Sequence, residues 1–489
     1  MNASVEPPRR RSVALAAGAV AALAFVATAV GIAGPATYGA IVSGDEPQYL
    51  LTAISLGEDA GLDISDEIAG ERFRPFHEVD LLPQSLERSD GARVSPHDPL
   101  LPALLAVPML LGGWVGAKLT LALLAAALAA LSLWTAVRRF ATPLLPATVV
   151  VGVFACSAPL AVYGQQIYPE VPAAVATLAA VAALTGRLGP SGVVVLGIAV
   201  VVLPWLAVKY VPVAAALASI GLVRLWRTPG TGRRRAFVLV GVLAVAGAGY
   251  LAAHVAWYGG VTVYASGEFF TANGGQLSVL GTEPDYSGRA QRLLGLLVGR
   301  TFGIAAWQPA WLLAVPAAAA LVRRRPAGWP ALGVPIVVAW LVATFAAATM
   351  QGWWFPGRQI VIILPLIVIA IAWWVGVVPS TGRARPRRLL LAGGLGALGI
   401  WSYGWLAAQA AMRRLTWIVD FFETADPWYR LWRRALPDYL DVTAQTWALH
   451  GCWLAVLAIA AVWGWRSAAT PPRTWSADRP AALDVRRPT

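Results

Sequence analysis

Charged residues are scarce in this sequence: only 13% of its 489 residues are Asp, Glu, Lys or Arg, about half the share found in soluble domains. Lysine is nearly missing, with two lysines among 38 basic residues. Cysteine is equally rare, and both copies, Cys156 and Cys452, lie in apolar runs. The low charge excludes an ordinary soluble domain, and the low cysteine count excludes a disulfide framework or a thiolate metal site.

The sequence contains many apolar runs of about 20 residues. Hydrophobic residues make up 58% of the chain, and its mean hydropathy is +0.64. Runs of this length predict transmembrane helices, so the expected fold is an all-α polytopic membrane protein with about twelve spans. The predicted spans are 13–34, 115–137, 143–162, 171–186, 190–208, 211–226, 236–257, 304–322, 329–350, 359–377, 389–409 and 447–465. The run 99–113 is too short to cross and is expected to be re-entrant or interfacial.

The net charge of +13 is distributed in a way that argues against a nucleic-acid partner. Basic clusters border the apolar runs, as in the cytoplasmic loops of membrane proteins, and anionic lipid headgroups are their expected neighbours. Starting from a cytoplasmic N-terminus, alternating spans place every basic cluster inside and both termini inside. The loop 35–98, which holds 13 of the 25 acids, is then outside.

The same reading gives the domain organisation. Residues 1–12 are a cytoplasmic N-terminus, and 13–377 are the main transmembrane module with the outer loop 35–98. Residues 378–465 are C-terminal transmembrane helices with an outer loop at 410–446. The polar tail 466–489 is expected to be cytoplasmic and disordered.

Several short segments occur in an order typical of one enzyme superfamily. An acidic pair follows the first span, a His-x-Pro element precedes the next helix, and a further acid lies at the outer side two helices later. The segments are "SGDEPQYLL" 43–51, "SPHDPLLP" 95–102, "YGQQIYPEVPAA" 163–174, "PWLAVKYVP" 204–212, "RLLGLLVGRTFGIAAWQPAWLLA" 292–314 and "GRQIVIILPL" 357–366. In this order they resemble the C-type (GT-C) glycosyltransferases, which include protein mannosyltransferases and lipid A aminoarabinose transferases.

The resemblance covers about residues 13–377 and implies a GT-C-like transmembrane fold. It also implies transfer of a sugar, of the mannose or arabinose class, from a polyprenyl-phosphate donor. The acceptor would be an envelope glycan, glycolipid or protein outside a bacterial plasma membrane. The tandem prolines usual after the histidine are replaced here by "HDP", and the last third of the chain matches nothing in the family. A polytopic transporter and a lipid-sugar ligase or polymerase are the alternatives.

The first candidate site residues are the adjacent carboxylates Asp45 and Glu46. Transfer to a hydroxyl needs a base that accepts the hydroxyl proton, and a carboxylate held at the membrane surface meets that need. We assign Asp45 as the base and Glu46 as the group that orients Asp45 or the acceptor. The alternative is that the pair caps the following helix, which "DEPQYLL" also suits. A divalent cation bridging the pair and a phosphate is chemically allowed, but the sequence does not require one.

Three cations are candidates for the donor phosphate: Lys209, Arg358 and, third, Arg300. Each lies at or within an apolar run, where a charge is costly and commonly functional. The alternative is snorkelling of Lys209 to the interface and interfacial anchoring of Arg358 beside Trp353 and Trp354.

The remaining candidates would bind or position the substrate. Glu170 lies at an outer helix end, where the alternative is an ordinary solvated acid. His97 could bind the phosphate or order Asp45, while the neighbouring Asp98 is expected to be a helix N-cap. The predicted sugar contacts are Tyr49, Tyr163, Gln166, Trp353 and Trp354.

Overall fold

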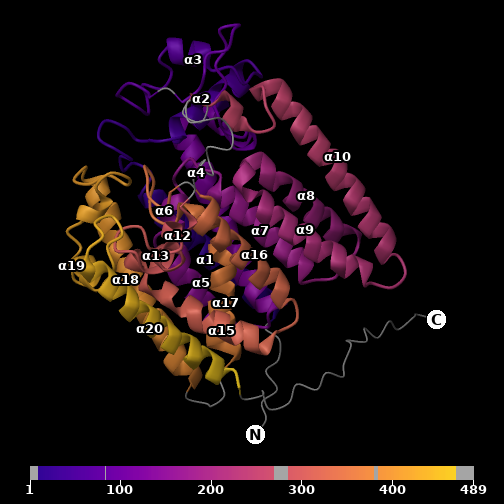
Figure 1. Cartoon of the computed structure of the whole chain (residues 1–489), viewed down its shortest axis with the longest axis vertical. Coiled ribbons are helices and arrows are strands. Elements are labelled where there is room, and N and C mark those ends of the chain that lie inside the picture. Colours follow the sequence, from indigo (N-terminus) through magenta and orange to yellow (C-terminus); the bar gives the residue numbers. More distant parts are fainter. Residues whose placement is uncertain (1–8, 83, 269–284, 348, 379–383, 470–489) are drawn as a thin grey trace.

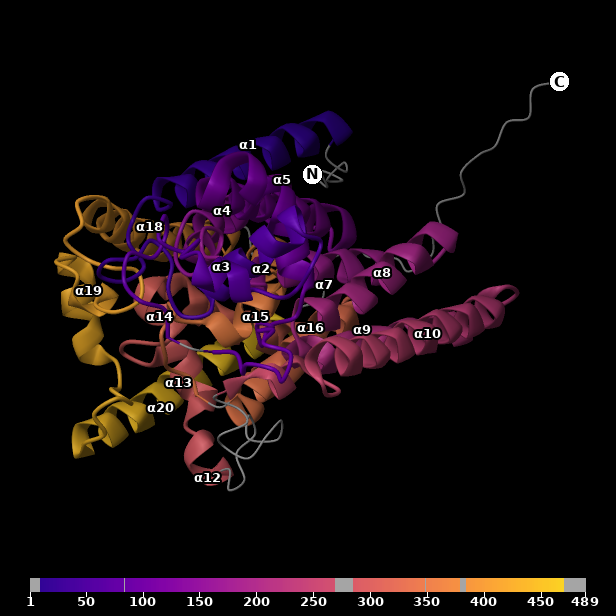
Figure 2. The ribbon, with the colours of Figure 1, turned by 90° about the horizontal axis from the view of Figure 1, so that it is seen from above.

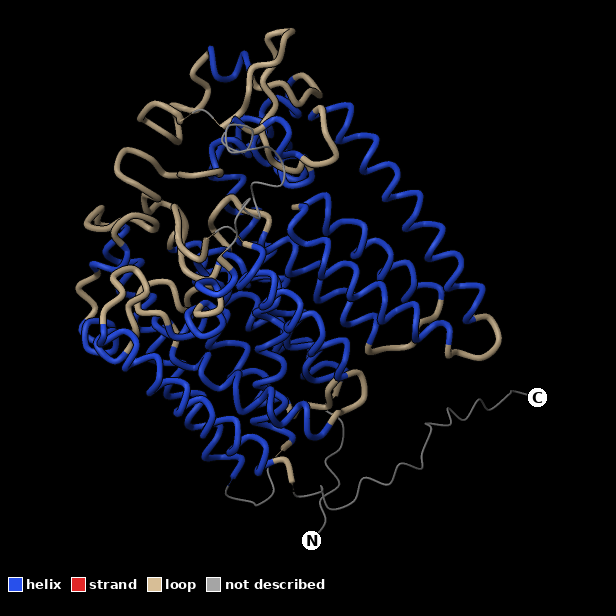
Figure 3. The backbone as a smooth tube through the Cα atoms, in the orientation of Figure 1, coloured by secondary structure: helices blue, strands red, loops and turns tan. Residues whose placement is uncertain are grey.

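The computed structural model describes residues 9–82, 84–268, 285–347, 349–378 and 384–469, and these are predominantly helical (Figure 1). Within these ranges the extended segments form isolated β-bridges and no strand. Figure 3 shows the loops gathered mainly beyond one end of the helix bundle. The tail beyond residue 469, expected to be disordered, lies outside the described residues.

The bundle is built from helices of very different lengths. The α-helices are α1 Arg10–Val30, α2 Glu46–Glu58, α3 Ser65–Ala69, α4 Leu100–Arg139, α5 Leu144–Ala155, α6 Leu160–Tyr163, α7 Glu170–Leu184, α8 Pro190–Leu206, α9 Val211–Trp226, α10 Gly232–Tyr258, α12 Tyr286–Arg289, α13 Arg292–Val298, α14 Ile304–Trp307, α15 Ala314–Arg324, α16 Trp329–Leu341, α17 Leu364–Val377, α18 Ala384–Ala411, α19 Pro427–Trp432 and α20 Ala444–Ser467. The 3-10 turns are η1 Val208–Tyr210, η2 Val263–Ser266, η4 Pro309–Leu313, η6 Arg358–Ile363, η7 Phe421–Glu423 and η8 Arg433–Ala435, and a π-helical turn, η5, covers Val342–Ala346.

The polytopic fold class predicted from the sequence is confirmed. Eight helices among the described residues are long and apolar enough to cross a membrane, and three shorter apolar helices, α5, α7 and α8, accompany them. The eighth predicted span, 304–322, is divided among α14, η4 and α15. Every predicted span therefore coincides with helical structure, although not every one is a single long helix.

Burial separates a central helix from peripheral ones. The apolar window of the η6–α17 segment is 94% buried, whereas the windows in α20 and in α10 with η2 are 11% and 17% buried. A helix that is apolar on all sides is suited to the centre of a bundle, and one whose apolar surface faces outward is suited to lipid. Viewed from above, α10 lies along one side of the assembly and α20 along another (Figure 2).

The apolar run 99–113 is not a separate segment, because it forms the first part of α4. That helix has 40 residues and would be about 60 Å long if straight, twice the thickness of a bilayer core. It breaks at Gly113, whose φ of 57° and ψ of −154° suit glycine. The break lets residues 100–112 change direction and pack on α2. An interfacial position for this part stays a prediction.

The basic turns gather at one end of the bundle. Arg224 donates a hydrogen bond of 3.1 Å to the carbonyl of Gly186, which connects the last turn of α9 to the turn after α7. Arg324, at the end of α15, donates at 2.6 Å to the carbonyl of Ala468, just after α20. Segments predicted to share the cytoplasmic side are thus neighbours in space.

The predicted outer loops meet at the opposite end, around the acidic loop 35–98 (Figure 1). The amide of Leu86 donates at 2.9 Å to the carbonyl of Ser266, and that of Trp417 donates at 3.0 Å to Pro35. The loops after α10 and α18 are therefore joined to the first loop through backbone hydrogen bonds. This arrangement surrounds the helix ends that carry the candidate site.

Candidate functional site

Four charged side chains from distant parts of the sequence converge in one charge cluster. Asp45 precedes α2, Glu170 is the first residue of α7, Lys209 lies in η1, and Arg358 is the first residue of η6. Three of the four thus mark the start of a helical segment, and Lys209 lies in the short turn that precedes α9. Unsatisfied backbone N–H groups at helix starts favour nearby negative charge, so acids are stabilised there.

Arg358 is the centre of the charge cluster. Its Nη2 donates at 2.6 Å to Asp45 Oδ2, and its Nε donates at 3.1 Å to Glu170 Oε1. The guanidinium lies 4.0 Å from the ring centroid of Tyr168, and the side chain is only 10% exposed. Gly357, with φ of 88°, makes the turn that brings Arg358 inward. The planar guanidinium is suited to holding two carboxylates while stacking on an aromatic ring.

Lys209 completes the charge cluster from the other side of Glu170. Its Nζ donates at 2.7 Å to the same Oε1 that Arg358 contacts. The Glu170 side chain is 1% exposed, so the alternative of a solvated helix end is wrong. Its Oε2 is buried and has no hydrogen-bond partner among the described residues. The snorkelling alternative for Lys209 is also disfavoured, because the ammonium group is turned toward this buried acid.

Asp45 occupies the N-cap position of α2 but makes no capping hydrogen bond. Its carboxylate instead contacts Arg358, and the Nε2 of His97 lies 3.7 Å from Asp45 Oδ2. Burial alone would raise the pKa of Asp45, but Arg358 and His97 outweigh it and hold that pKa well below its usual range. Asp45 is therefore ionised and forms an ion pair with Arg358.

Glu46 is fully buried and holds the backbone rather than its neighbour. Its Oε2 accepts a hydrogen bond of 2.9 Å from the Ser43 amide, and its Oε1 accepts one of 2.6 Å from the Ile167 amide. Burial raises the pKa of Glu46, and nearby Lys118 opposes that shift. These contacts fasten the start of α2 to the segment that leads into α7. The Glu46 carboxylate does not hydrogen-bond to Asp45. Glu46 could therefore act as an orienting group only through contact with the acceptor.

Sequence reasoning missed Lys118, which lies within the second predicted span. Its side chain is buried, and Nζ donates at 3.1 Å to the Ile41 carbonyl. The scarcity of lysine could have identified it from the sequence, because Lys118 is the only lysine besides Lys209. It supplies the positive charge that faces Glu46 from α4.

Asp98 was expected to cap α4, and that expectation is wrong. The N-cap residue is Pro99, and no side chain caps the helix. The Asp98 Oδ2 accepts instead from the Val208 amide at 3.0 Å, and Oδ1 lies 2.9 Å from His254 Nε2. Tyr250 also donates to Oδ1 at 3.0 Å. Asp98 thus joins α4 and α10 to the residue that precedes Lys209.

The predicted sugar contacts differ in whether their side-chain polar atoms already have a hydrogen-bond partner. Tyr49 is buried, with its ring centroid 4.5 Å from that of His97. The Tyr163 hydroxyl donates to the carbonyl of Phe355 and is already occupied. Gln166 is 2% exposed, and neither polar atom of its side chain has a partner in the described part of the chain. Its neighbour Gln165, which sequence reasoning missed, shares this property.

The two tryptophans proposed as sugar contacts differ in exposure. Trp353 is 60% exposed, whereas the Trp354 ring lies 5.0 Å from the guanidinium carbon of Arg358. Trp354 is therefore the one that borders the charge cluster.

Arg300 is the candidate that the structure places elsewhere. Its Nε donates to the carbonyls of Arg433 and Leu436 at 3.1 and 3.2 Å, and its Nη1 donates to Asp438 at 3.0 Å. These partners all belong to the 410–446 loop. In this arrangement Arg300 fixes that loop to the start of α14 and does not join the other two cations.

The Asp45–Glu46 pair does not form a metal-binding arrangement as it stands. The Oδ2 of Asp45 faces Arg358, and both oxygens of Glu46 accept from backbone amides. Among the described residues, three acids with closely spaced ligand atoms occur at another place, Asp59, Asp66 and Glu67.

Comparisons with known proteins found similarity in structure only. No family model matches the chain, and no curated protein matches it. The crystal structure of ArnT from Cupriavidus metallidurans, bound to undecaprenyl phosphate, superimposes with a TM-score of 0.48 and 14% identity, covering 94% of this chain and 77% of that one. The Archaeoglobus fulgidus oligosaccharyltransferase in its apo form gives a TM-score of 0.41 and 13% identity, covering 82% and 56%. At these values the comparisons assign neither substrate nor activity to this chain.

Proposed function

We propose that the protein is a membrane glycosyltransferase that transfers one sugar from a polyprenyl-phosphate donor to an acceptor outside the plasma membrane. The observation that carries the proposal is the charge cluster of Asp45, Glu170, Lys209 and Arg358. It places one carboxylate base candidate beside two cations at the end of an apolar bundle. A lipid donor anchored in the bilayer would present its phosphate at this depth.

The proposed reaction is a single displacement. The acceptor oxygen attacks the anomeric carbon as its proton passes to the Asp45 carboxylate, and the bond from that carbon to the phosphate oxygen breaks. The lipid phosphate leaves with the bonding electron pair, and Arg358 and Lys209 offset its charge. The anomeric configuration is inverted. Mannose and arabinose are the proposed sugar classes, in keeping with the family resemblance.

The closed ion pairs of the charge cluster give this mechanism an order of events. Arg358 is shared between Asp45 and Glu170. A donor phosphate competes with Asp45 for the same guanidinium, so its arrival would release the carboxylate. Freed from Arg358, Asp45 would regain a pKa closer to its usual range and become a better base.

A transporter is the competing class, and the position of the charges disfavours it. Transporter sites are typically near the bilayer midplane, at interrupted helices of repeated halves. Here the charge cluster lies at the ends of α7 and the η6–α17 segment, under the acidic loop.

The direct test is turnover by purified protein with a panel of synthetic lipid-phosphate sugars and envelope acceptors. Transfer with inversion from at least one donor is expected. Failure of every donor, together with electrogenic or proton-coupled solute uptake in vesicles, would refute the glycosyltransferase assignment.

A further inference from the structure

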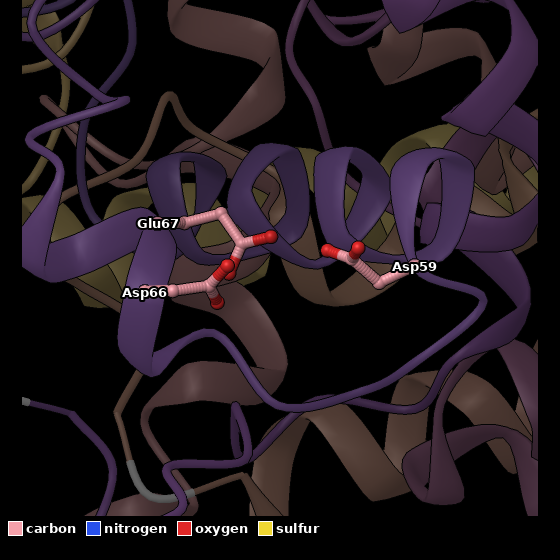
Figure 4. A group of neighbouring side chains, drawn as sticks. All are labelled: Asp59, Asp66 and Glu67. Atoms are coloured by element: carbon pink, nitrogen blue, oxygen red, sulfur yellow. The ribbon is translucent and has the colours of Figure 1, made fainter.

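Three acids in the outer loop lie together, away from the charge cluster. Asp59 directly follows α2, while Asp66 and Glu67 belong to α3. Figure 4 shows the carboxyl groups of Asp66 and Glu67 side by side, with that of Asp59 facing them. One ligand atom from each lies within 4.8 Å of the others. Because α2 has 13 residues, this acidic trio is about 20 Å along the helix from Asp45.

Glu67 distinguishes this trio from an ordinary solvated acidic patch. Its side chain is only 2% exposed, and its Oε2 has no hydrogen-bond partner within the described ranges. The nearby Arg72 is engaged elsewhere, since its Nη1 and Nη2 donate to Glu58 at 2.9 and 2.6 Å. A buried carboxylate aimed at two others, without a bound cation, is an expensive arrangement.

We propose that Asp59, Asp66 and Glu67 bind one calcium ion. Carboxylate oxygens are the ligands that hard cations prefer, and the ion would neutralise the mutual repulsion of the three acids. Two ligands of one ion can be no farther apart than twice the metal–oxygen distance. That limit is about 4.6–5.2 Å for Ca²⁺, so one Ca²⁺ can contact all three carboxylates, and its flexible coordination geometry tolerates uneven spacing.

The calcium ion would connect α2 to α3 and stiffen the acidic loop. Asp59 and Asp66 are exposed, so the ion can enter from water, and water molecules complete its coordination. The position just beyond α2 is also favourable, because the carbonyl end of a helix attracts cations. Three carboxylates on a partly open loop predict a dissociation constant on the order of 0.1–1 mM, as in extracellular calcium modules.

The test is a direct binding measurement with calcium ions alone, on the full chain in detergent. Equilibrium dialysis with radioactive calcium should give one saturable site in the wild-type protein. Asp66→Asn and Glu67→Gln should each weaken it by roughly tenfold or more. Glu78→Gln is the matched control, because Glu78 is an exposed acid of the same loop outside the trio, and it should bind like wild type.

Folding of the variants is checked by thermal unfolding in the absence of calcium. Both trio variants remove repulsion, so their midpoints should equal or exceed that of wild type. Absence of saturable calcium binding to wild type, or equal affinity in the trio variants, would overturn the proposal. Mg²⁺ binding as tight as Ca²⁺ binding would overturn the choice of ion. The readout is independent of glycosyl transfer, so it stands apart from the proposed function.

Discussion

Asp45→Asn is the substitution that best separates the possible roles of the site. The aspartate accepts one charge-assisted hydrogen bond of 2.6 Å from Arg358, and such a bond is worth about 1.5–3 kcal/mol. Arg358 would remain paired with Glu170 in the variant, so no buried cation is left alone. The variant should therefore fold, with a loss of stability no larger than that range.

Turnover and donor binding should move in different directions in this variant. The amide cannot accept the acceptor proton, so turnover should fall by about 10²–10⁴-fold. Donor binding should be as tight as in wild type or tighter, because the phosphate no longer competes with Asp45 for Arg358. The upper bound of this gain is the lost hydrogen bond, which corresponds to roughly tenfold to hundredfold in the dissociation constant.

The assay combines turnover of a lipid-phosphate sugar with a separate titration of the lipid phosphate, both on monodisperse protein. Glu46→Gln is the companion variant. If Asp45→Asn turns over normally while Glu46→Gln is inactive, the base is Glu46. Near-normal turnover in both variants would refute the mechanism, and weaker donor binding in Asp45→Asn would refute the competition for Arg358.

Three further predictions follow from the same geometry. Lys209→Ala should weaken donor binding by roughly 10- to 100-fold, whereas Arg300→Ala should leave it unchanged, because among the described residues the Arg300 side chain donates its hydrogen bonds to the 410–446 loop; equal affinities measured by titration would reduce Lys209 to an interface anchor. A cysteine at exposed Ser89 in a cysteine-free background should react with an impermeant reagent on intact cells, and one at exposed Thr231 should not; the reverse pattern would invert the topology. In calcium-free buffer, Glu67→Gln should raise the unfolding midpoint more at pH 8 than at pH 5. The folded-state pKa of about 8 lies above the unfolded value of about 4.3, so the destabilisation by Glu67 grows between those values, and a pH-independent gain would contradict it.

The helical framework was predictable because each span depends on a local property, the length of an apolar run. The central position of α17 was not, since its sequence and that of a lipid-facing span are both apolar. The merging of 99–113 into α4 was also missed. That prediction rested on length, whereas the outcome depends on one glycine that lets the helix break without ending it.

The charge cluster was predictable in part for a similar reason. Glu170, Lys209 and Arg358 stand out because a charge bordering an apolar run is costly without a partner. Their mutual pairing needed the three-dimensional structure. Asp98 was misjudged because its partner His254 is 156 residues away, and a cap is the only role that local sequence offers it. Arg300 resembled the other cations locally, but its partners belong to a distant loop.

Through Asp98, the long helix α10 is joined to the backbone beside the charge cluster. The helix α10 has 27 residues and is about 40 Å long, whereas a bilayer core is about 30 Å thick. Such a helix accommodates the mismatch by tilting, and its tilt follows the thickness of the surrounding lipid. Since the outer end of α10 is tied through Asp98 to the backbone beside Lys209, a change of tilt pulls on the placement of that cation. In a bilayer, the tilt of α10 and the position of Lys209 would therefore be coupled.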